Sequence, residues 1–431
     1  AGLSGFVAET SIRDGNDVSP RAGFTWVPDR EGHWRVQGGG GFFYHGMDLA
    51  LFSEAALYDG GVTIRRVVGD VGGWPAPDPA AVPFADRRLT LFRDSYQNPR
   101  TGKLSLDVSR LVGGVTVEVS GNYFHTDYLP RRTDLNLAPG ASGSTLEGRA
   151  VFGTLVKQGG SITVQPGTNR AIPGYDLVHG IAPTGFADYY GLTLSLERIV
   201  AGRLRLSAAW TWSVTTDNTP LARSGDPADL VSPFPGQIIE DDWRDGRSDL
   251  DIPHRVTAAA EYRVPGPLDL VLGGRYRFRS GLPFTPGFRD GVDVNGDGSG
   301  RNDPVSLDPT IPGVPELLSE NPCLRDMEDG FASRNGCREP SHHALDLHVA
   351  LGLGVQSLGA PLYLTLDAFN VAATSSGVRD HAALLVDTAQ PLVVDGSGNV
   401  TIPLTANPGF GSFLSRRGED RVIRLGLRVG E

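Results

Sequence analysis

YYGLTLSLERIVAGRLRLSAAWTWSVTTD, residues 189–217, contains two runs in which apolar and polar side chains alternate, joined by a short break at 200–202. The apolar positions are Tyr190, Leu192, Leu194, Leu196, Leu204, Leu206, Ala208, Trp210, Trp212 and Val214. Most positions between them are small, polar or charged. Because successive side chains of a strand point to opposite faces, this pattern predicts a β-hairpin with one apolar and one polar face.

The bulk composition argues against two classes of protein. The formal net charge is −11, with 39 Lys and Arg against 50 Asp and Glu. A nucleic-acid surface needs clustered cationic side chains, so nucleic acid is not an expected partner. No run reaches the roughly 18 consecutive apolar residues of a membrane-spanning helix. The sequence therefore does not predict a helical membrane protein.

Similar alternating runs recur along the chain. They are predicted at 21–26 with 34–44, 103–110 with 115–127, 254–264 with 268–279, 345–355 with 362–370, and 421–429. Weaker candidates lie at 62–67 and 148–156. The segments between the hairpins are rich in Pro and Gly and are predicted to be irregular.

Alternation alone leaves two architectures open. The apolar face is an internal core in a soluble β-sandwich and meets lipid in a membrane barrel. Short turns are predicted near 27–33, 111–114, 200–202, 265–267 and 356–361, and they alternate strictly with long loops at 45–100, 128–187, 215–252, 280–342 and 371–420. Outer-membrane barrels keep short turns on the periplasmic side and long loops outside, so this pattern favours the barrel.

Strand length and aromatic residues agree with a barrel. The predicted strands have about 9–13 residues, and a tilted strand needs roughly 9–11 to cross a bilayer. Aromatic residues lie near strand ends, as in an interfacial girdle: Tyr44, Tyr123, Trp210, Trp212, Tyr262, Tyr276 and Phe278. We therefore predict an all-β fold, a transmembrane antiparallel β-barrel. In the first hairpin, Leu192, Leu194, Leu204, Leu206 and Trp210 would face lipid, and Thr193, Glu197, Arg203 and Arg205 the lumen.

Several segments resemble one family. They are SPRAGFTWVPDREGHWRVQGGGGFFY (19–44), YYGLTLSLERIVAGRLRLSAAWTWSVTTDN (189–218), DLDIPHRVTAAAEYRVPG (249–266), YRFRSGLPFTP (276–286), DVNGDGSGRNDP (293–304) and LYLTLDAFNVA (362–372). In this order they are similar to successive barrel segments of TonB-dependent outer-membrane receptors and transporters, specifically the Oar-like branch.

The resemblance implies a barrel of 22 strands in the outer membrane of a Gram-negative bacterium, with about 11–14 of the strands in this chain. Residues 1–431 would be the C-terminal portion of the barrel domain, with the plug domain and early strands absent. Implied partners are outer-membrane lipid and lipopolysaccharide, an unknown ligand, and the TonB complex, reached through a plug not in this chain. The end, LGLRVGE (425–431), departs from the family's usual aromatic finish, which leaves a trimmed C-terminus open.

The two cysteines, Cys323 and Cys337, lie in a segment rich in Pro, Asn and Gly. We interpret them as one disulfide in an oxidising compartment. Closing a loop of about 15 residues stabilises a fold by roughly 3 kcal/mol in the chain-entropy model. Two unrelated thiols in a reducing compartment are the alternative.

Residues 293–299 match the first half of a calcium loop. In such a loop alternate oxygen-bearing side chains converge on a hard cation and a glycine permits the sharp turn. The expected Glu at the twelfth position is Pro304 here, and Asp303 is the nearest substitute. Calcium is thus a candidate cofactor, with a solvated, turn-rich loop as the alternative. The predicted ligands are Asp293, Asn295, Asp297, Ser299 and Asp303.

Other polar residues give weaker signals. His342 and His343 are adjacent on a strand and point to opposite faces, which disfavours a joint metal site with His348. The glycines at 38–41 lie within a strand and do not form a phosphate loop. The charged residues predicted to face the lumen would bind a solute, hold a plug, or simply neutralise one another. They are Glu118, Glu197, Arg205, Arg275, Arg277, Arg279, Asp346 and Asp367.

Energy-coupled uptake of a scarce ligand through long extracellular loops is the leading functional hypothesis. A passive outer-membrane pore or a structural or adhesive barrel is the alternative, and a soluble β-rich binding protein is the third. No residue spacing supports a catalytic constellation, so no catalytic residues and no enzyme are predicted. The ligand-binding residues are unknown, because selectivity would lie in irregular loops.

Overall fold

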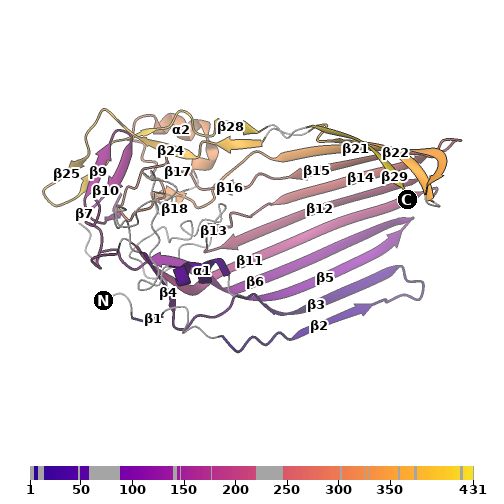
Figure 1. Cartoon of the computed structure of the whole chain (residues 1–431), viewed down its shortest axis with the longest axis horizontal. Helices are drawn as coiled ribbons and strands as arrows, with labels where there is room; N and C mark the ends of the chain where they lie inside the picture. Colours follow the sequence, from indigo (N-terminus) through magenta and orange to yellow (C-terminus); the bar gives the residue numbers. More distant parts are fainter. Residues whose placement is uncertain are drawn as a thin grey trace, which may run out of the picture.

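The computed structural model describes residues 4–7, 14–46, 49–57, 88–138, 143–145, 147–175, 177–219, 246–300, 303–325, 327–328, 330–357, 360–372, 376–417 and 421–430. One large sheet of long strands dominates it, with the long loops gathered at one end (Figure 1). The weak strand candidate at 62–67 lies outside the described residues. No helix among the described residues is long and apolar enough to cross a membrane.

Eleven strands form the main path of the sheet, each hydrogen-bonded to the next in chain order. They are β2 (Arg21–Trp26), β3 (Trp34–Tyr44), β5 (Arg100–Val112), β6 (Val115–Asp134), β11 (Leu177–Val200), β12 (Leu204–Asp217), β14 (His254–Val264), β15 (Leu270–Arg279), β21 (His342–Ser357), β22 (Ala360–Phe369) and β29 (Val422–Val429). The strands β1 (Phe6–Val7), β4 (Arg88–Arg93) and β13 (Gly246–Arg247) bring the sheet to 14. The all-β prediction is confirmed, and this single sheet is not the facing pair of a sandwich.

The register keeps the two faces of the sheet distinct from strand to strand. Leu194 lies opposite Trp210 on β12 and Val119 on β6. Thr193 lies opposite Thr211, and their hydroxyls hydrogen-bond at 2.9 Å. The apolar stripe of one strand thus continues across its neighbours, and so does the polar stripe.

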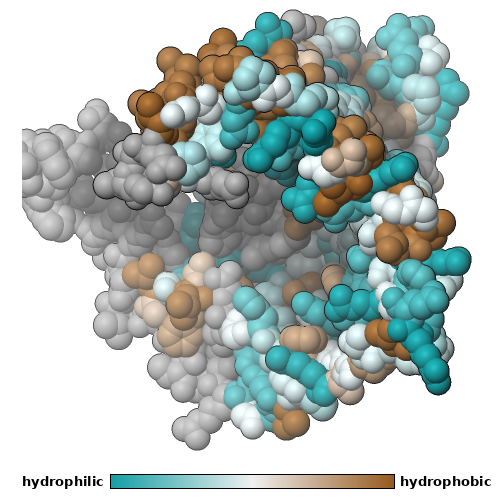
Figure 2. All heavy atoms as spheres, turned by 90° about the vertical axis from the view of Figure 1, so that its right-hand side faces the viewer, coloured by the Kyte–Doolittle hydropathy of each residue, from teal (hydrophilic) through white to brown (hydrophobic). Residues whose placement is uncertain are grey.

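The apolar face is exposed over the whole width of the sheet. Leu104 on β5 is 60% exposed and Leu425 on β29 is 71% exposed, and Leu192, between them, is 43% exposed. Seen from the end with the short turns, the described parts form an arc around a hollow (Figure 2). An apolar surface of this extent is rare on a water-soluble monomer and fits the predicted contact with lipid.

Two strands are longer than predicted. β6 has 20 residues and β11 has 24, whereas roughly 9–11 cross a bilayer. The added part of β11 pairs with β6 through shifts of register at Ala182, Gly185 and Ala187, and in parallel with β4. Its Gly and Pro residues break the alternation, so the sequence pattern does not reveal it.

The long loops fold into a packed cap. Residues 45–100, predicted to be irregular, contain α1 (Leu49–Leu57) and β4, and the candidate strand at 148–156 resolves into two short strands. The other cap elements are β7 (Gly143–Ser144), β8 (Ala150–Val151), β9 (Leu155–Gln158), β10 (Ser161–Val164), β16 (Pro283–Phe284), β17 (Gly287–Phe288), α2 (Val314–Glu320), η3 (Pro322–Arg325), β18 (Met327–Glu328), β19 (Phe331–Ala332), β20 (Cys337–Arg338), β23 (Ser376–Arg379), β24 (Ala382–Val386), β25 (Val393–Val394), β26 (Val400–Thr401), β27 (Leu404–Ala406) and β28 (Phe413–Arg417). Two hydrophobic clusters hold them together: Phe284, Val305, Leu307, Leu317, Leu324 and Leu384 in one, and Val151, Ile162, Val292, Val294 and Val400 in the other.

A buried polar cluster attaches α1 to the ends of β4, β6 and β11 that lie nearest the cap. Glu54 pairs with Arg132 on β6 and accepts a hydrogen bond from Thr90 on β4 at 3.2 Å. The same carboxylate lies 3.2 Å from Nδ1 of His179 on β11. Leaving either partner unpaired in this buried position would cost about 3–5 kcal/mol, so the contact holds α1 in place.

The face assignment predicts opposite effects for neighbouring substitutions on β11. Leu196, between Val117 and Ala208, lies midway between the turn at 200–203 and the aromatic pair Tyr190 and Trp212. Leu196→Arg should cost roughly 2–4 kcal/mol in folding into lipid, because its charge would lie near the bilayer midplane, while Ser195→Arg should be mild. Urea titration of refolding into vesicles measures both, and a larger loss for Ser195→Arg would reverse the faces.

Acidification should loosen α1. Burial lowers the pKa of His179 below its ordinary 6.5, so below that pH the unfolded chain takes up a proton that the folded chain does not, and stability falls. Burial alone would raise the pKa of Glu54, but the His179 hydrogen bond and the Arg132 charge lower it. Its stabilisation is therefore present at and above pH 4.5 and is lost only at lower pH.

The test is hydrogen exchange of residues 49–57 at pH 7 and pH 5.5, corrected for the intrinsic rate. Protection should be weaker at pH 5.5 in the native protein and nearly equal at the two pH values in His179→Gln. Unchanged protection in the native protein would contradict the assignment.

Candidate functional site

A hollow of about 260 Å³ lies on the polar face of the sheet, over β12, β14, β15, β21 and β22. Its floor is open because Gly273, opposite Glu261 and His348, has no side chain, and a Cβ there would lie 3.3 Å from the Cβ of His348. Its charged lining is Arg205, Glu261, Arg275, Asp346, His348 and Asp367. Acidic and basic side chains therefore lie together around this hollow.

Several of these charges are paired. Nδ1 of His348 lies 2.6 Å from Oδ1 of Asp367. Arg277 donates to Oδ2 of Asp346 at 2.9 Å, while the amide of Asn370 donates to Oδ1 of the same carboxylate at 3.0 Å. These contacts favour the mutually neutralising wall for this part of the face.

Of the eight charged residues predicted to face the lumen, the structure brings four together around the hollow. Arg205, Arg275, Asp346 and Asp367 lie around the hollow. Arg277 and Arg279 continue along β15 toward the cap, and Glu118 and Glu197 lie on β6 and β11, with Glu197 3.3 Å from Arg205. Alternation also places Glu261 and His348 on this face, but only the strand order shows that they share one hollow.

The histidines separate as the alternation predicts. His343 lies on the apolar face, where its Nδ1 is 2.6 Å from the Tyr276 hydroxyl. His342 and His348 lie on the polar face, opposite Arg279 and Gly273.

The predicted calcium loop is buried within the cap. Oδ1 and Oδ2 of Asp293 accept backbone hydrogen bonds from Gly296 and Gly298 at 2.7 and 2.9 Å. The side chains of Asn295 and Asp297 accept similar bonds from the amides two residues on, including that of Ser299. The loop is thus wound as a series of tight turns held by bonds from its own backbone amides to its side-chain oxygens.

Asp303 closes this loop. It receives hydrogen bonds from Arg149 at 2.9 Å and from the amide of Val294 at 3.0 Å. Burial, with the nearby charge of Asp293, raises the pKa of Asp303 to about 7 against the opposing charge of Arg149. A cation would favour the ionised carboxylates here, so calcium stays a prediction for this loop.

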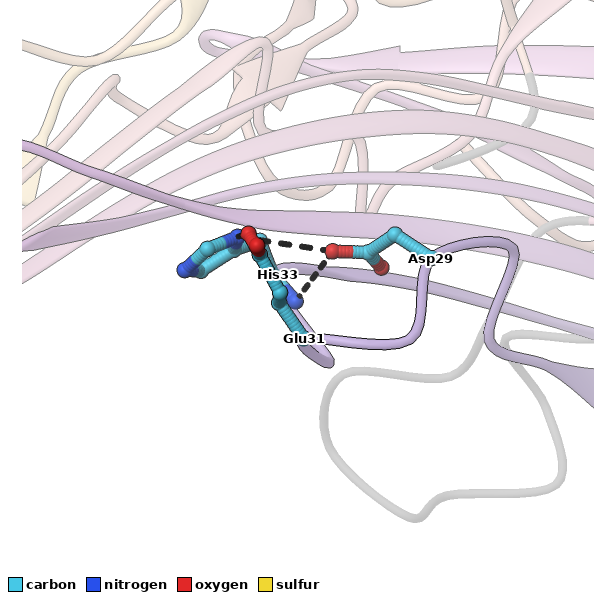
Figure 3. A group of neighbouring side chains, drawn as sticks. All are labelled: Asp29, Glu31 and His33. Atoms are coloured by element: carbon cyan, nitrogen blue, oxygen red, sulfur yellow. Dashed lines mark hydrogen bonds and ion pairs between the residues drawn. The ribbon is translucent and has the colours of Figure 1, made fainter.

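In the described part of the chain, one group of three carboxylate and histidine side chains has its ligand atoms close enough together to hold a metal ion. Asp29, Glu31 and His33 meet in the turn between β2 and β3 (Figure 3). The carboxylate of Asp29 accepts the backbone amides of His33 and Trp34 at 2.8 and 3.0 Å. These bonds shape the turn, and the exposed trio needs no metal to explain it.

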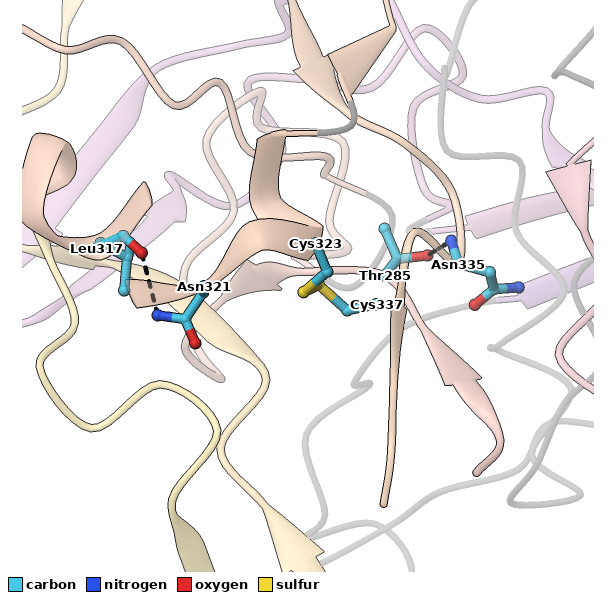
Figure 4. The surroundings of a disulfide bond; sticks show 6 residues. All are labelled: Thr285, Leu317, Asn321, Cys323, Asn335 and Cys337. Atoms are coloured by element: carbon cyan, nitrogen blue, oxygen red, sulfur yellow. Dashed lines mark hydrogen bonds between the residues drawn. A yellow bond between two sulfur atoms is a disulfide. The ribbon is translucent and has the colours of Figure 1, made fainter. Parts of the chain in front are cut away.

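The cysteines are joined, as predicted. The Cys323–Cys337 disulfide has a Cα–Cα distance of 5.1 Å and links η3 to β20 beside Asn321 and Asn335 (Figure 4). Cys337 is fully buried in the cap cluster around Leu324. Next to it, Arg334 and Arg338 bind Asp217 and Asp251 at the ends of the strand region, so the disulfide-bearing loop is attached to the sheet.

Comparison with protein families gives one match. The family model described as "Outer membrane beta barrel domain" matches residues 6–376. No curated protein matches the sequence.

Similar solved structures include the outer membrane transporter YddB from Escherichia coli, with 11% identity, 95% of this chain and 40% of that chain covered, and a TM-score of 0.47. The FrpB iron transporter from Neisseria meningitidis has 11% identity, coverage of 95% and 38%, and a TM-score of 0.42. A ferric enterobactin receptor from Pseudomonas aeruginosa has 10% identity, coverage of 83% and 35%, and a TM-score of 0.41. This chain therefore spans well under half the length of each.

The calcium prediction has a direct test. Calorimetric titration of the purified protein with CaCl₂ should show one saturable site, and Asp293→Asn should abolish it, because the substitution removes the charge of the predicted ligand at the first position of the loop. Asp395→Asn is the matched control, since Asp395 forms a similar turn elsewhere in the cap through the amides of Ser397 and Asn399. If the native protein does not bind calcium, the prediction is wrong and residues 293–304 form a turn-rich loop without a metal site.

Proposed function

This chain belongs to the outer membrane beta barrel domain family, and we propose that it forms part of the barrel of a TonB-dependent receptor that takes up a scarce ligand. Its place in the outer membrane follows from the family. The apolar face of the sheet is then the lipid face, and the polar face, with its hollow, lines the lumen. The sequence resemblance to the Oar-like branch of TonB-dependent receptors supports energy-coupled uptake of the ligand.

The directions of the two end strands carry the proposal that this sheet is part of a larger barrel. β2 leads into a short turn and β29 follows a long loop, so both run toward the short-turn end. A barrel in which all neighbours are antiparallel needs an even number of strands, so β2 and β29 require an odd number of strands between them. Eleven more would give the roughly 22 strands of the family that the sequence resembles.

The cap and the wall support a receptor rather than an open tube. The disulfide braces the loop between β15 and β21, and the pairs Arg334–Asp217 and Arg338–Asp251 attach that loop to residues at the ends of β12 and of the loop before β14. Loops ordered by such contacts present a defined outer surface for a ligand. We propose that the ligand is captured there and passes along the polar wall, with energy supplied through a plug that contacts TonB.

A paired measurement on the native complex, extracted from outer membranes, tests this function. The C-terminal domain of TonB, immobilised on resin, should retain the complex, because an energy-coupled receptor must contact it. In planar bilayers the same complex should show no steady conductance until urea unfolds the plug reversibly, because the plug fills the lumen.

A passive pore gives the reverse result. It would conduct without urea and would not be retained by TonB, and an adhesive barrel would likewise fail to bind TonB. Either result contradicts energy-coupled uptake while leaving the outer-membrane fold intact.

A further inference from the structure

We propose that the outer end of the lumen wall carries an anion-binding site formed by Arg255 on β14 and Arg279 on β15. The site would take a small solute bearing carboxylate or phosphate groups. The inference rests on the proposed function only in placing this face in a lumen that solutes enter.

The register puts two like charges directly opposite each other. Arg255 pairs with Arg279, and Arg279 pairs with His342 on the other side. Cross-strand neighbours of this kind have Cβ atoms about 4.5–5.5 Å apart, and like charges there are destabilising. Both arginine side chains are exposed on the polar face. An anion that binds between them would therefore relieve the repulsion.

No residue that the structure describes neutralises either arginine. Among the residues that the structure describes, the guanidinium groups of Arg255 and Arg279 have no ion pair, hydrogen bond or stacked ring. On the neighbouring strand β21 the polar face carries Asp346, and both of its oxygens are already occupied by Arg277 and the Asn370 amide. Farther from the cap, by contrast, charged residues of the wall are paired, as His348 is with Asp367.

The surrounding wall adds to the positive potential. On the polar face, the stretches of β12 to β29 that pair with one another carry eight arginines against three carboxylates, although the whole chain has a net charge of −11. The arginines are Arg205, Arg255, Arg263, Arg275, Arg277, Arg279, Arg424 and Arg428, and the carboxylates are Glu261, Asp346 and Asp367. An excess of one sign along a wall draws oppositely charged solutes toward it.

The location suits an entering solute. Arg255 follows the long loop that ends near 252, and Arg279 precedes the loop that begins at 280, so the pair lies where the wall meets the cap. Thr211, the cross-strand neighbour of Arg255, and Thr257, which lies opposite Arg277, place hydroxyl groups on the same face. Two guanidiniums side by side present the forked donors that bind carboxylate and phosphate oxygens in pairs.

The test uses the native complex in detergent, titrated calorimetrically with inorganic phosphate and, separately, with citrate. The native complex should bind at least one of them saturably, and the stronger of the two identifies the favoured group. Arg255→Gln with Arg279→Gln should weaken that binding at least about tenfold, because two charge-assisted contacts are lost.

The matched control is Arg424→Gln with Arg428→Gln, which removes the same charge from the same face. These arginines already stack on Phe369 and Tyr363, at 5.4 and 5.0 Å from the ring centroids, so binding should change less than about twofold. Folding of every variant is checked by heat-modifiable gel mobility.

Two results would overturn the site. One is an absence of saturable binding by the native complex, as expected if an acidic segment of the plug holds the arginines. The other is an equal loss in both double variants, which would mean a diffuse field. Retention on TonB is measured on the same samples, so failure of the anion site and failure of energy coupling are separate outcomes.

Discussion

The pairing of backbone hydrogen bonds between neighbouring strands is the constraint on which the rest of this structure depends. In the hydrocarbon core no water is present to satisfy an amide or a carbonyl, so each spanning strand must be paired along both edges. The register from β2 to β29 meets this requirement for every inner strand and keeps the two faces in phase across the sheet. The exposed apolar face, the polar wall and the separation of short turns from long loops all follow from it.

The polar wall combines two electrostatic regimes. Around the hollow formed at Gly273, charged residues neutralise one another, as His348 does with Asp367, and such pairs stiffen the wall without attracting solutes. Nearer the cap, Arg255 and Arg279 lie opposite each other, and no described carboxylate forms an ion pair with either. A cationic mouth above a wall whose charges are partly paired would concentrate an anion at entry and then let it move on, since binding must be weak enough for release.

Much of the sheet is predictable from sequence because period-two alternation is a local signal. The predicted strand at 254–264 agrees with β14 to the residue, and the short turns lie where alternation stops. The cap was largely missed, because α1 is held by Glu54 contacts with residues 78 and 125 positions away, which leave no local pattern. The hollow and the Arg255–Arg279 pair depend on which residues lie opposite each other, and a single strand does not carry that information.

The central claim is that this sheet is an arc of a closed, even-stranded outer-membrane barrel with the polar face inside. A strand-resolving cryo-electron microscopy reconstruction of the particle extracted from native outer membranes tests it most directly. The claim predicts a closed barrel in which β2 and β29 each have an antiparallel neighbour outside this sheet and Arg279 faces the lumen. A barrel closed by direct parallel pairing of β2 with β29, or one with Leu196 turned inward, would contradict it.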